Sequence, residues 1–422
     1  MRRRLRATFA ALSVRNFRLF VVGQLVSNVG TWMQKLAQGW LILDLTGSGT
    51  WLGAIVAVQH LPTLVIGPFA GVLADRHGRR AILLLTGTAG AIPALVLGVL
   101  TLTDRASIQL VFILALVVGL LDALETPARQ ALPSDLVPIR LLSNAVTLSN
   151  VVQNMGKAVG PAIAGVLISV VGLPLTFLVN SVSFLAVVCA LLLMSPEAFV
   201  NRHRVVRARG QVREGLRHVR STPELFGPMM LLAVAGLLAL NFQVLLLLLA
   251  RTTFGGGSAE AGYLLAALGA GSVVGGLVLA GVLRATRSRI IYAALVLSAL
   301  FVLTGLAPSY WSALCLVFVL GSATVAFKTL VSTWLQLRSG PEMRGRVMSL
   351  LVVCSAGMSP LGAPLMGWAA STFGTRATFI VIGVCVAAAA VVCRAYLGAA
   401  RSSAEDSVRR TKACAVQEVK EM

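Results

Sequence analysis

Residues 61–100 read LPTLVIGPFAGVLADRHGRRAILLLTGTAGAIPALVLGVL, where two apolar stretches flank the short charged segment DRHGRR at 75–80. A helix needs about 20 consecutive apolar residues to cross the hydrocarbon core of a bilayer. Both stretches reach that length, because they extend over 51–74 and 81–101. This part of the chain therefore predicts two membrane-spanning helices joined by a charged connection.

The same length criterion predicts an all-α integral membrane protein. Of the 422 residues, 57% are hydrophobic and 12% are charged, and the mean hydropathy is +0.87. A soluble domain is about 45–50% apolar and about 25% charged. Twelve segments are long and apolar enough to span, with very short links inside the fifth/sixth and eleventh/twelfth pairs: 17–43, 51–74, 81–101, 107–126, 144–172, 174–194, 226–250, 260–283, 289–306, 310–333, 347–372 and 375–398.

The basic residues fix the predicted orientation. With the N-terminus in the cytoplasm, 30 of the 36 Lys and Arg fall in cytoplasmic segments, and the outward loops hold only Arg105, Arg251 and Arg376. Positive charge concentrates on the cytoplasmic side of membrane proteins. Both termini are therefore predicted to be cytoplasmic. These basic residues would face an anionic membrane leaflet, which accounts for the net charge of +21. The charge therefore does not require a nucleic-acid partner.

A long basic loop divides the chain. Residues 1–194 and 226–398 each hold six predicted spans, 195–225 form a cytoplasmic linker, and 399–422 form a cytoplasmic tail. Basic and apolar residues alternate irregularly over 202–220, which predicts a short amphipathic helix at the membrane surface.

The two halves also repeat one another. Four residues of the fifth and sixth spans recur 202 positions later: Gly160, Gly165, Gly172 and Phe177 return as Gly362, Gly367, Gly374 and Phe379. Internal repetition of this kind predicts two pseudo-symmetric six-helix bundles, with a substrate site between them near the bilayer midplane.

The N-terminus predicts a retained first span. A basic start precedes 17–43, which is too long for the apolar part of a signal peptide, and no small-residue cleavage site follows it. Arg exceeds Lys, and Ala, Leu, Gly and Val are abundant, which indicates a GC-rich bacterium. We therefore predict a multi-pass protein of the bacterial inner membrane.

The connection GVLADRHGRR at 71–80 resembles motif A of the major facilitator superfamily, whose pattern is G-x-L-a-D-r-x-G-r-[RK]. The matching residues are Gly71, Leu73, Asp75, Arg76, Gly78, Arg79 and Arg80. In that family the acidic and basic residues latch the cytoplasmic faces of the halves together when the cavity opens outward. The resemblance implies this role for Asp75 and Arg79, completed by Glu125 or Asp122 at the end of the fourth span. A basic loop that only sets topology is the alternative.

A second motif, GKAVGPAIAG at 156–165, resembles the G-x-x-x-G-P-x-x-x-G element of exporters in the same superfamily. Small residues let helices approach closely. A proline within a span frees backbone groups that line a cavity or are satisfied by neighbouring helices. The motif residues are Gly156, Gly160, Pro161 and Gly165. The resemblance implies export, and a generic packing seam is the alternative.

Three segments of the first half, 16–33, 61–76 and 142–167, are similar to the bacterial enterobactin-exporter branch, which also contains multidrug and macrolide exporters. The superfamily resemblance extends over 17–398. It implies twelve helices in the major facilitator fold, a monomer, and a small organic cargo that is siderophore-like or antibiotic-like.

Polar residues inside spans are costly and usually face a cavity. In the first span they recur on one helical face, at Gln24, Asn28, Thr31, Lys35 and Gln38. The fifth span has a similar face with Asn150, Asn154 and Lys157, and the seventh span holds Asn241 and Gln243. We expect these residues to line the substrate cavity. Hydrogen bonding between helices is the alternative for each amide.

The sequence places no Asp or Glu at mid-depth of the predicted spans, whereas Lys35 and Lys157 lie within them. Such a cavity favours an anionic or neutral cargo over a cationic drug. Export is expected to exchange the cargo for protons, and histidine titrates in the useful range. The candidate proton carriers are His60, Asp44 and Glu125, with no single one preferred.

Motifs of other protein classes are missing from the sequence. No G-x-x-x-x-G-K-[ST] loop for ATP, no HExxH and no GxSxG occurs. The six cysteines form no CxxC pair and no Cys/His cluster. We therefore predict a secondary active exporter without metal or cofactor, and no enzyme. A broad multidrug pump and an uncoupled facilitator are the alternatives.

Overall fold

The computed structural model describes residues 9–195, 211–279, 285–340 and 342–421, and the side chains of 400–421 and of several residues within 68–75 and 211–215 lie outside that description. The described chain is helical and contains no strand. Its elements are η1 (Ala10–Ser13), α2 (Arg15–Thr46), α3 (Gly49–His77), α4 (Arg79–Leu102), α5 (Ile108–Ala131), α6 (Pro133–Leu136), η2 (Ile139–Leu141), α7 (Leu142–Val171), α8 (Leu173–Leu192), α9 (Gln211–Ser221), α10 (Pro223–Leu238), α11 (Phe242–Leu248), η4 (Leu249–Thr253), α12 (Ser258–Leu279), α13 (Arg287–Gly305), α14 (Tyr310–Arg338), α15 (Arg344–Ser355), α16 (Ser359–Phe373) and α17 (Thr375–Glu421).

These elements confirm an all-α membrane protein. Within the described residues, 11 helical segments are long and apolar enough to cross a membrane. A twelfth helix, α2, is 32 residues long and packs among them, but its polar stripe makes it less apolar than the others. The predicted first span is therefore present as a long helix whose polar residues are buried by its neighbours.

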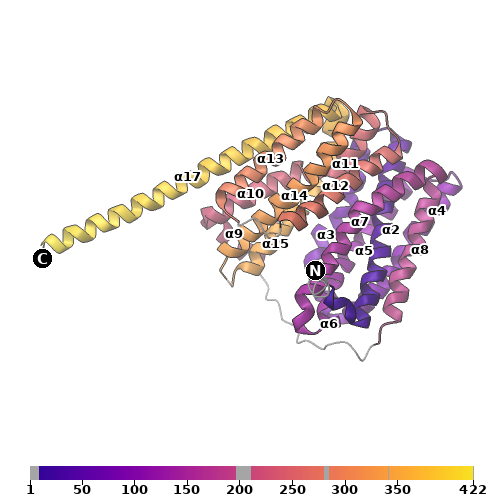
Figure 1. Ribbon diagram of the computed structural model, residues 1–422, viewed down its shortest axis with the longest axis horizontal. Helices are drawn as coiled ribbons and strands as arrows, with labels where there is room; N and C mark the ends of the chain where they lie inside the picture. Colours follow the sequence, from indigo (N-terminus) through magenta and orange to yellow (C-terminus); the bar gives the residue numbers. More distant parts are fainter. Residues whose placement is uncertain (1–8, 196–210, 280–284, 341, 422) are drawn as a thin grey trace.

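The helices form two groups that Figure 1 shows side by side, one in indigo to magenta and one in orange to yellow. In the first group, α2 packs on α7 and α8, and α4 packs on α5 and α8. In the second, α13 packs on α14 and α17, and α10 packs on α15 and α17. The groups meet where α7 packs on α12 and where α3 packs on α16. The last part of α17 projects well beyond the bundle.

The repeated glycines build both of these contacts. A Cβ at Gly165 of α7 would lie 2.7 Å from the carbonyl oxygen of Ser258 at the start of α12. A Cβ at the matching Gly367 of α16 would overlap the carbonyl oxygen of Gly49 at the start of α3. The next repeated pair, Gly172 and Gly374, ends α7 and α16 with φ of 87° and 84°. That conformation favours glycine, so equivalent residues of the repeat have equivalent roles.

We call the end of the bundle that carries residues 77–79 and 133–141 the basic end, and the opposite end, with the turn at Gly47, the far end. The hydrogen bonds between the groups lie toward the far end: Gly49 N donates to Ser371 Oγ (3.0 Å), and Ser258 Oγ donates to Gly165 O (3.3 Å). Between described residues, no hydrogen bond or ion pair joins the groups at the basic end. The molecule is therefore closed at the far end.

Two predicted spans are broken, which corrects the prediction of continuous helices over 226–250 and 347–372. The first divides into α10, α11 and the π-helical turn η4, and the Asn241 amide at the break donates to the carbonyl of Leu237 (2.8 Å). The second divides into α15 and α16 at 356–358, next to Pro360. Non-helical backbone at membrane depth is tolerated where protein or a cavity surrounds it, so both breaks lie inside the bundle.

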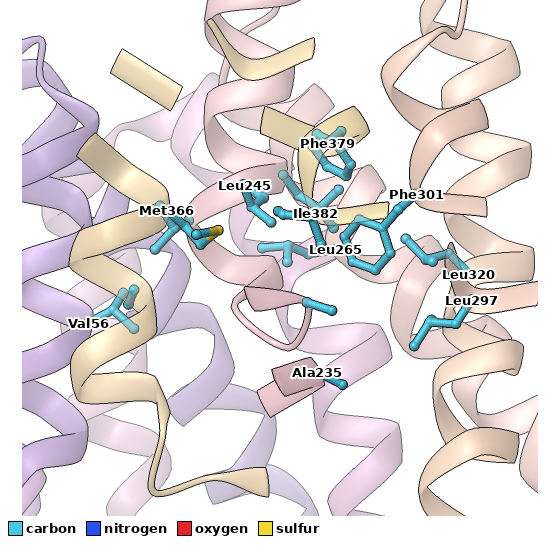
Figure 2. Packing of buried hydrophobic residues seen from close by; sticks show 14 of the residues in the cluster. Val56, Ala235, Leu245, Leu265, Leu297, Phe301, Leu320, Met366, Phe379 and Ile382 are labelled. Carbon is cyan, nitrogen blue, oxygen red and sulfur yellow. The ribbon is translucent and has the colours of Figure 1, made fainter. Parts of the chain in front are cut away.

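A continuous apolar core connects the groups. Figure 2 shows Val56 of α3 facing Met366 of α16, while Phe301, Phe379 and Ile382 fill the second group. The rings of Phe301 and Phe379 are 5.7 Å apart between centroids, and Phe379 is fully buried. Other large apolar side chains are exposed on the outside of the helices, as lipid contact requires: Phe69, Leu277 and Val392 are examples.

The glycine contacts predict the effect of a larger side chain at Gly53. A Cβ there would overlap the carbonyl oxygen of Ala363 in α16, so Gly53→Val should push α3 and α16 apart at the far end. A cysteine at Ala370, which is 6% exposed, reports the opening in a background without native cysteines. We expect its reaction with a membrane-impermeant maleimide to rise several-fold in Gly53→Val.

The matched control is Gly67→Val on the same helix, where a Cβ would approach only Thr63 Cγ2, at 3.9 Å. This variant should leave the labelling unchanged. Equal labelling of the two variants would contradict a closure that depends on the glycine contacts.

Candidate functional site

The charged connection at the basic end joins α3 to α4 through Gly78, whose φ is 86°. Asp75 lies near the end of α3, and its side chain, like the surroundings of Gly71, is outside the described part of the structure. Leu73 and Arg76 are exposed. The two arginines that follow the turn point back into the first group. Arg80 Nε donates to the carbonyl of Leu191 at the end of α8, at 3.0 Å.

Arg79 binds a carboxylate that the sequence did not suggest. Its Nη1 lies 2.7 Å from Asp135 Oδ1 and also donates to Ser134 Oγ (3.0 Å) and the carbonyl of Ala131 (3.1 Å). The acidic residue that meets the basic connection is therefore Asp135 of the short helix α6. This corrects the expectation that Glu125 or Asp122 lies there.

Glu125 and Asp122 lie deeper, because α5 continues to Ala131 instead of ending near 126. By length and composition, the segment that could span a membrane runs over Ile108–Leu136, and Asp122 is at its middle. This corrects the expectation that no carboxylate lies at mid-depth. Arg129 lies beside both carboxylates, with Nη1 at 2.8 Å from Glu125 Oε1 and Nη2 at 4.0 Å from Asp122 Oδ1.

These carboxylates line a cavity inside the first group, between α2, α3, α4 and α5, with Phe184 of α8 also in its wall. Its polar wall consists of Thr31, Lys35, Gln59, His60, Thr86, Asp122, Glu125 and Arg129. The charge of Lys35 is close enough to interact with His60 and Asp122. His60 Nδ1 lies 2.9 Å from the carbonyl of Val56. A carbonyl only accepts, so Nδ1 carries the hydrogen and Nε2 is left to take up a proton.

The polar stripe of α2 divides between this cavity and the helix packing. Thr31 and Lys35 line the cavity, whereas Asn28 and Gln38 do not. Asn28 is 5% exposed and donates to the carbonyls of Val152 and Gln153 on α7. Gln38 is fully buried, donates to the carbonyl of Val111 and accepts from Gln59. The prediction that Asn28 and Gln38 line the cavity is thus corrected, because their amides hold neighbouring helices together.

The exporter-like motif of α7 brings two lysines together. A Cβ at Gly160 would lie 2.7 Å from Trp32 Cβ, and one at Gly156 would overlap the Asn28 amide, so both glycines let α2 approach α7. Trp32 then lies between Lys35 and Lys157, whose Nζ atoms are 4.8 and 5.7 Å from its ring centroid. Pro161 lies within α7, where its carbonyl oxygen faces Gly262 of α12.

The remaining amides of the predicted cavity have mixed positions. Asn150 is exposed and Asn154 half-buried on α7. Asn241 is buried at the break between α10 and α11, with its Oδ1 unpartnered among the described residues. Gln243 donates to the backbone carbonyl of Lys35 at 2.9 Å, so it connects the two groups directly.

Asp44 lies at the far end and bonds across the groups. Its Oδ1 is 2.6 Å from Arg251 Nη1 in η4, and the two side chains are 43% and 33% exposed. The guanidinium also lies 5.3 Å from the ring centroid of Trp40. Asp44 therefore closes the far end and lies apart from the cavity that holds His60 and Glu125.

Four residues of this site were not singled out from the sequence: Trp32, Gln59, Arg129 and Asp135. A signal existed for Arg129, which follows Glu125 by four residues, the spacing of a helical ion pair. Asp135 follows a proline after the apolar run, so its place against Arg79 depends on the fold of α6. Trp32 gave no signal, because aromatic residues are common in spans. Gln59 lies inside the predicted span 51–74, so it carried the same signal as the amides of the first span.

The pairing of Arg79 with Asp135 predicts a coupled loss of stability. In a double-mutant cycle of Arg79→Ala and Asp135→Ala, we expect a coupling of about 1 kcal/mol in the free energy of unfolding, because the pair is only partly exposed. Unfolding in mixed micelles measures it. In the same cycle with Asp122→Ala in place of Asp135→Ala, the two effects on the free energy of unfolding should be additive. A larger coupling of Arg79 to Asp122 than to Asp135 would show that Asp122 is the acidic partner of Arg79.

Known proteins similar to this chain include several transporters. It is 26% identical to the "Staphyloferrin A transporter" of Staphylococcus aureus over 364 residues, which are 84% of this chain and 90% of that protein. It is 24% identical to "Macrolide efflux protein A" of Streptococcus pyogenes over 387 residues, 88% of this chain and 93% of that protein. "Multidrug efflux pump Tap" of Mycolicibacterium fortuitum is 26% identical over 380 residues, 87% of this chain and 92% of that protein.

Solved structures share the fold. A bacterial homologue of the lysosomal transporter Spinster, inward-facing and unoccupied, has a TM-score of 0.72 at 16% identity and covers 91% of this chain and 97% of its own. A bacterial homologue of the iron transporter ferroportin, also inward-facing, has a TM-score of 0.71 at 15% identity and covers 90% and 98%. The family model described as "Transmembrane secretion effector" matches residues 6–421. The chain therefore belongs to this family of major facilitator transporters and is not an enzyme.

Proposed function

We propose that the protein is a secondary active exporter of small organic molecules in the bacterial inner membrane, where it works as a monomer by alternating access. The excess of Lys and Arg at the basic end supports a cytoplasmic location for that end and for both termini. Residues 1–194 and 226–398 would move as two bundles, with the linker 195–225 and the tail 399–422 in the cytoplasm.

One observation carries this proposal: the hydrogen bonds of Gly49 and Ser258 and the ion pair of Asp44, which join the groups among the described residues, lie toward the far end. With the basic end in the cytoplasm, this is the state in which an exporter takes up its cargo. Its glycine contacts and the pair Asp44–Arg251 would separate when the far end opens. The latch of the basic connection, including Asp75 and Arg79, would then close the opposite end.

Protons are the proposed coupling ion, moving inward as the cargo moves outward. The cavity inside the first group supports this, because Asp122, Glu125 and His60 can each bind a proton there. Arg129 and Lys35 hold positive charge beside the two carboxylates. Asp44 is a weaker candidate for coupling, since it is bonded to Arg251 at the far end.

The cargo is proposed to be siderophore-like or antibiotic-like. Relatives whose names state a siderophore, a macrolide and multiple drugs support this range. A broad multidrug pump is the second candidate, and it would accept chemically unrelated compounds at similar rates.

Inside-out vesicles with an acid interior test coupling and cargo together. A catecholate siderophore, a lipophilic cation and an uncharged macrolide are added in turn while a pH-sensitive dye reports the interior. Cargo that enters in exchange for protons makes the interior less acid, so the dye signal recovers. We expect recovery with at least one compound, and its loss in Asp122→Asn because an amide binds no proton.

The control is Asp104→Asn, an identical change in an exposed turn at the far end. It should keep the recovery. Movement of labelled cargo without any proton release would replace antiport by uncoupled transport, and recovery in Asp122→Asn would exclude Asp122 as a carrier. Transport of all three compounds would favour the multidrug pump.

A further inference from the structure

Three lysines lie inside the membrane-spanning helices without a carboxylate partner. Lys35, Lys157 and Lys328 have no Asp or Glu oxygen within 4.0 Å among the described residues. An unpaired ammonium at membrane depth is costly, and such residues mark substrate or ion pathways. Lys35 interacts with the charges of Asp122 and Glu125, so the question is what neutralises the other two.

Two of the ammonium groups share one aromatic ring. The Nζ atoms of Lys35 on α2 and Lys157 on α7 lie 4.8 and 5.7 Å from the centroid of the Trp32 ring. The face of an indole attracts a cation but does not cancel its charge. Gly156 and Gly160 bring the two helices together at this point. The fold therefore holds two like charges close together, which repel unless an anion joins them.

The third ammonium comes from the other group. Lys328 on α14 is close enough to Lys157 for their charges to interact. It lies ten residues before the end of α14 at Arg338, which is about 15 Å of helix. That depth is too great for the Lys328 side chain to reach the basic end. Lys157 and Lys328 are both exposed at this depth.

Lys157 lies where the two groups meet. The backbone of Lys157 contacts Gly269 on α12, its side chain lies by Trp32 on α2, and its charge interacts with Lys328 on α14. Helices of both groups thus surround it, which excludes a position facing lipid.

The number of unpaired charges around Lys157 indicates how many negative charges a bound anion would need. Asp122 and Glu125 interact with the charges of Lys35 and Arg129, whereas neither carboxylate interacts with Lys157 or Lys328. The carboxylates contact Arg129. Two positive charges therefore remain without compensation.

We propose that Trp32, Lys35, Lys157 and Lys328 form the binding site for an organic anion that carries at least two negative charges, with carboxylate or phenolate groups spread over a ring or chain. This inference rests on the proposed function and narrows its cargo. The anion bridges Lys157 of the first group and Lys328 of the second, and it lies against the Trp32 ring.

A series of aromatic carboxylates tests the valence. Benzoate, isophthalate and benzene-1,3,5-tricarboxylate share one ring and carry one, two and three charges. Binding to the full-length protein in phosphatidylcholine nanodiscs is measured by calorimetry at low salt. We expect the affinity to rise at least tenfold from benzoate to the tricarboxylate. Lys157→Gln and Lys328→Gln should each weaken tricarboxylate binding roughly tenfold or more, because each removes one charged hydrogen bond.

Two kinds of control separate the site from net charge and folding. Arg105→Gln removes one positive charge from an exposed loop at the far end and should bind like the unmodified protein. Lys157→Arg keeps the charge and should restore most of the affinity. Trp32→Phe should bind more tightly than Trp32→Leu, because only the former keeps an aromatic face.

An affinity that is equal across the three probes, or equal losses in Lys157→Gln and Arg105→Gln, would overturn the anion site. Macrolide export measured in parallel keeps this result separate from the proposed function. Macrolide export without tricarboxylate binding would contradict the anion site alone. Tricarboxylate binding that depends on Lys157 and Lys328, without export of any compound, would contradict the proposed exporter function alone.

Discussion

Backbone-to-backbone contact between α7 and α12, and between α3 and α16, is the constraint on which the rest of the structure depends. Lipid supplies no hydrophobic drive for helix association, so packing and hydrogen bonds must hold the bundle together. At Gly165 and Gly367 the facing helix approaches too closely for a side chain. The internal repeat makes the two contacts equivalent, and together they close one end of the molecule and leave a polar interior behind it.

Much of the fold could be predicted from the sequence, because membrane-spanning helices need long apolar segments and the basic residues concentrate in the connections on one side of the membrane. The turn at Gly78 was predictable because its positive φ favours glycine. The contacts at Gly165 and Gly367 were indicated by the internal repeat, since small residues let helices approach closely. The helix breaks were not predictable. A single amide, Asn241, ends α10 by bonding to its backbone, and nothing in an apolar window distinguishes it from a residue facing a cavity.

The site was less predictable, because it is assembled from residues of four helices. The stripe on α2 indicated one polar face, yet that face divides: Lys35 lines the cavity, and Gln38 bonds to Gln59 and α5. The depth of Asp122 depended on where α5 ends, and helix ends are the least certain part of a hydropathy reading. The partner of Arg79 depended on the fold of α6, which follows the apolar run.

The closure at the far end is weak, as an alternating mechanism requires. Two conformations that are both populated during a transport cycle differ in free energy by only a few kcal/mol. The pair Asp44–Arg251 is partly exposed, and such a pair contributes roughly 1 kcal/mol or less. The glycine contacts add dispersion, which is small for each atom pair. Neither contact buries an unpaired charge when it opens, because both groups of the pair reach solvent at the far end.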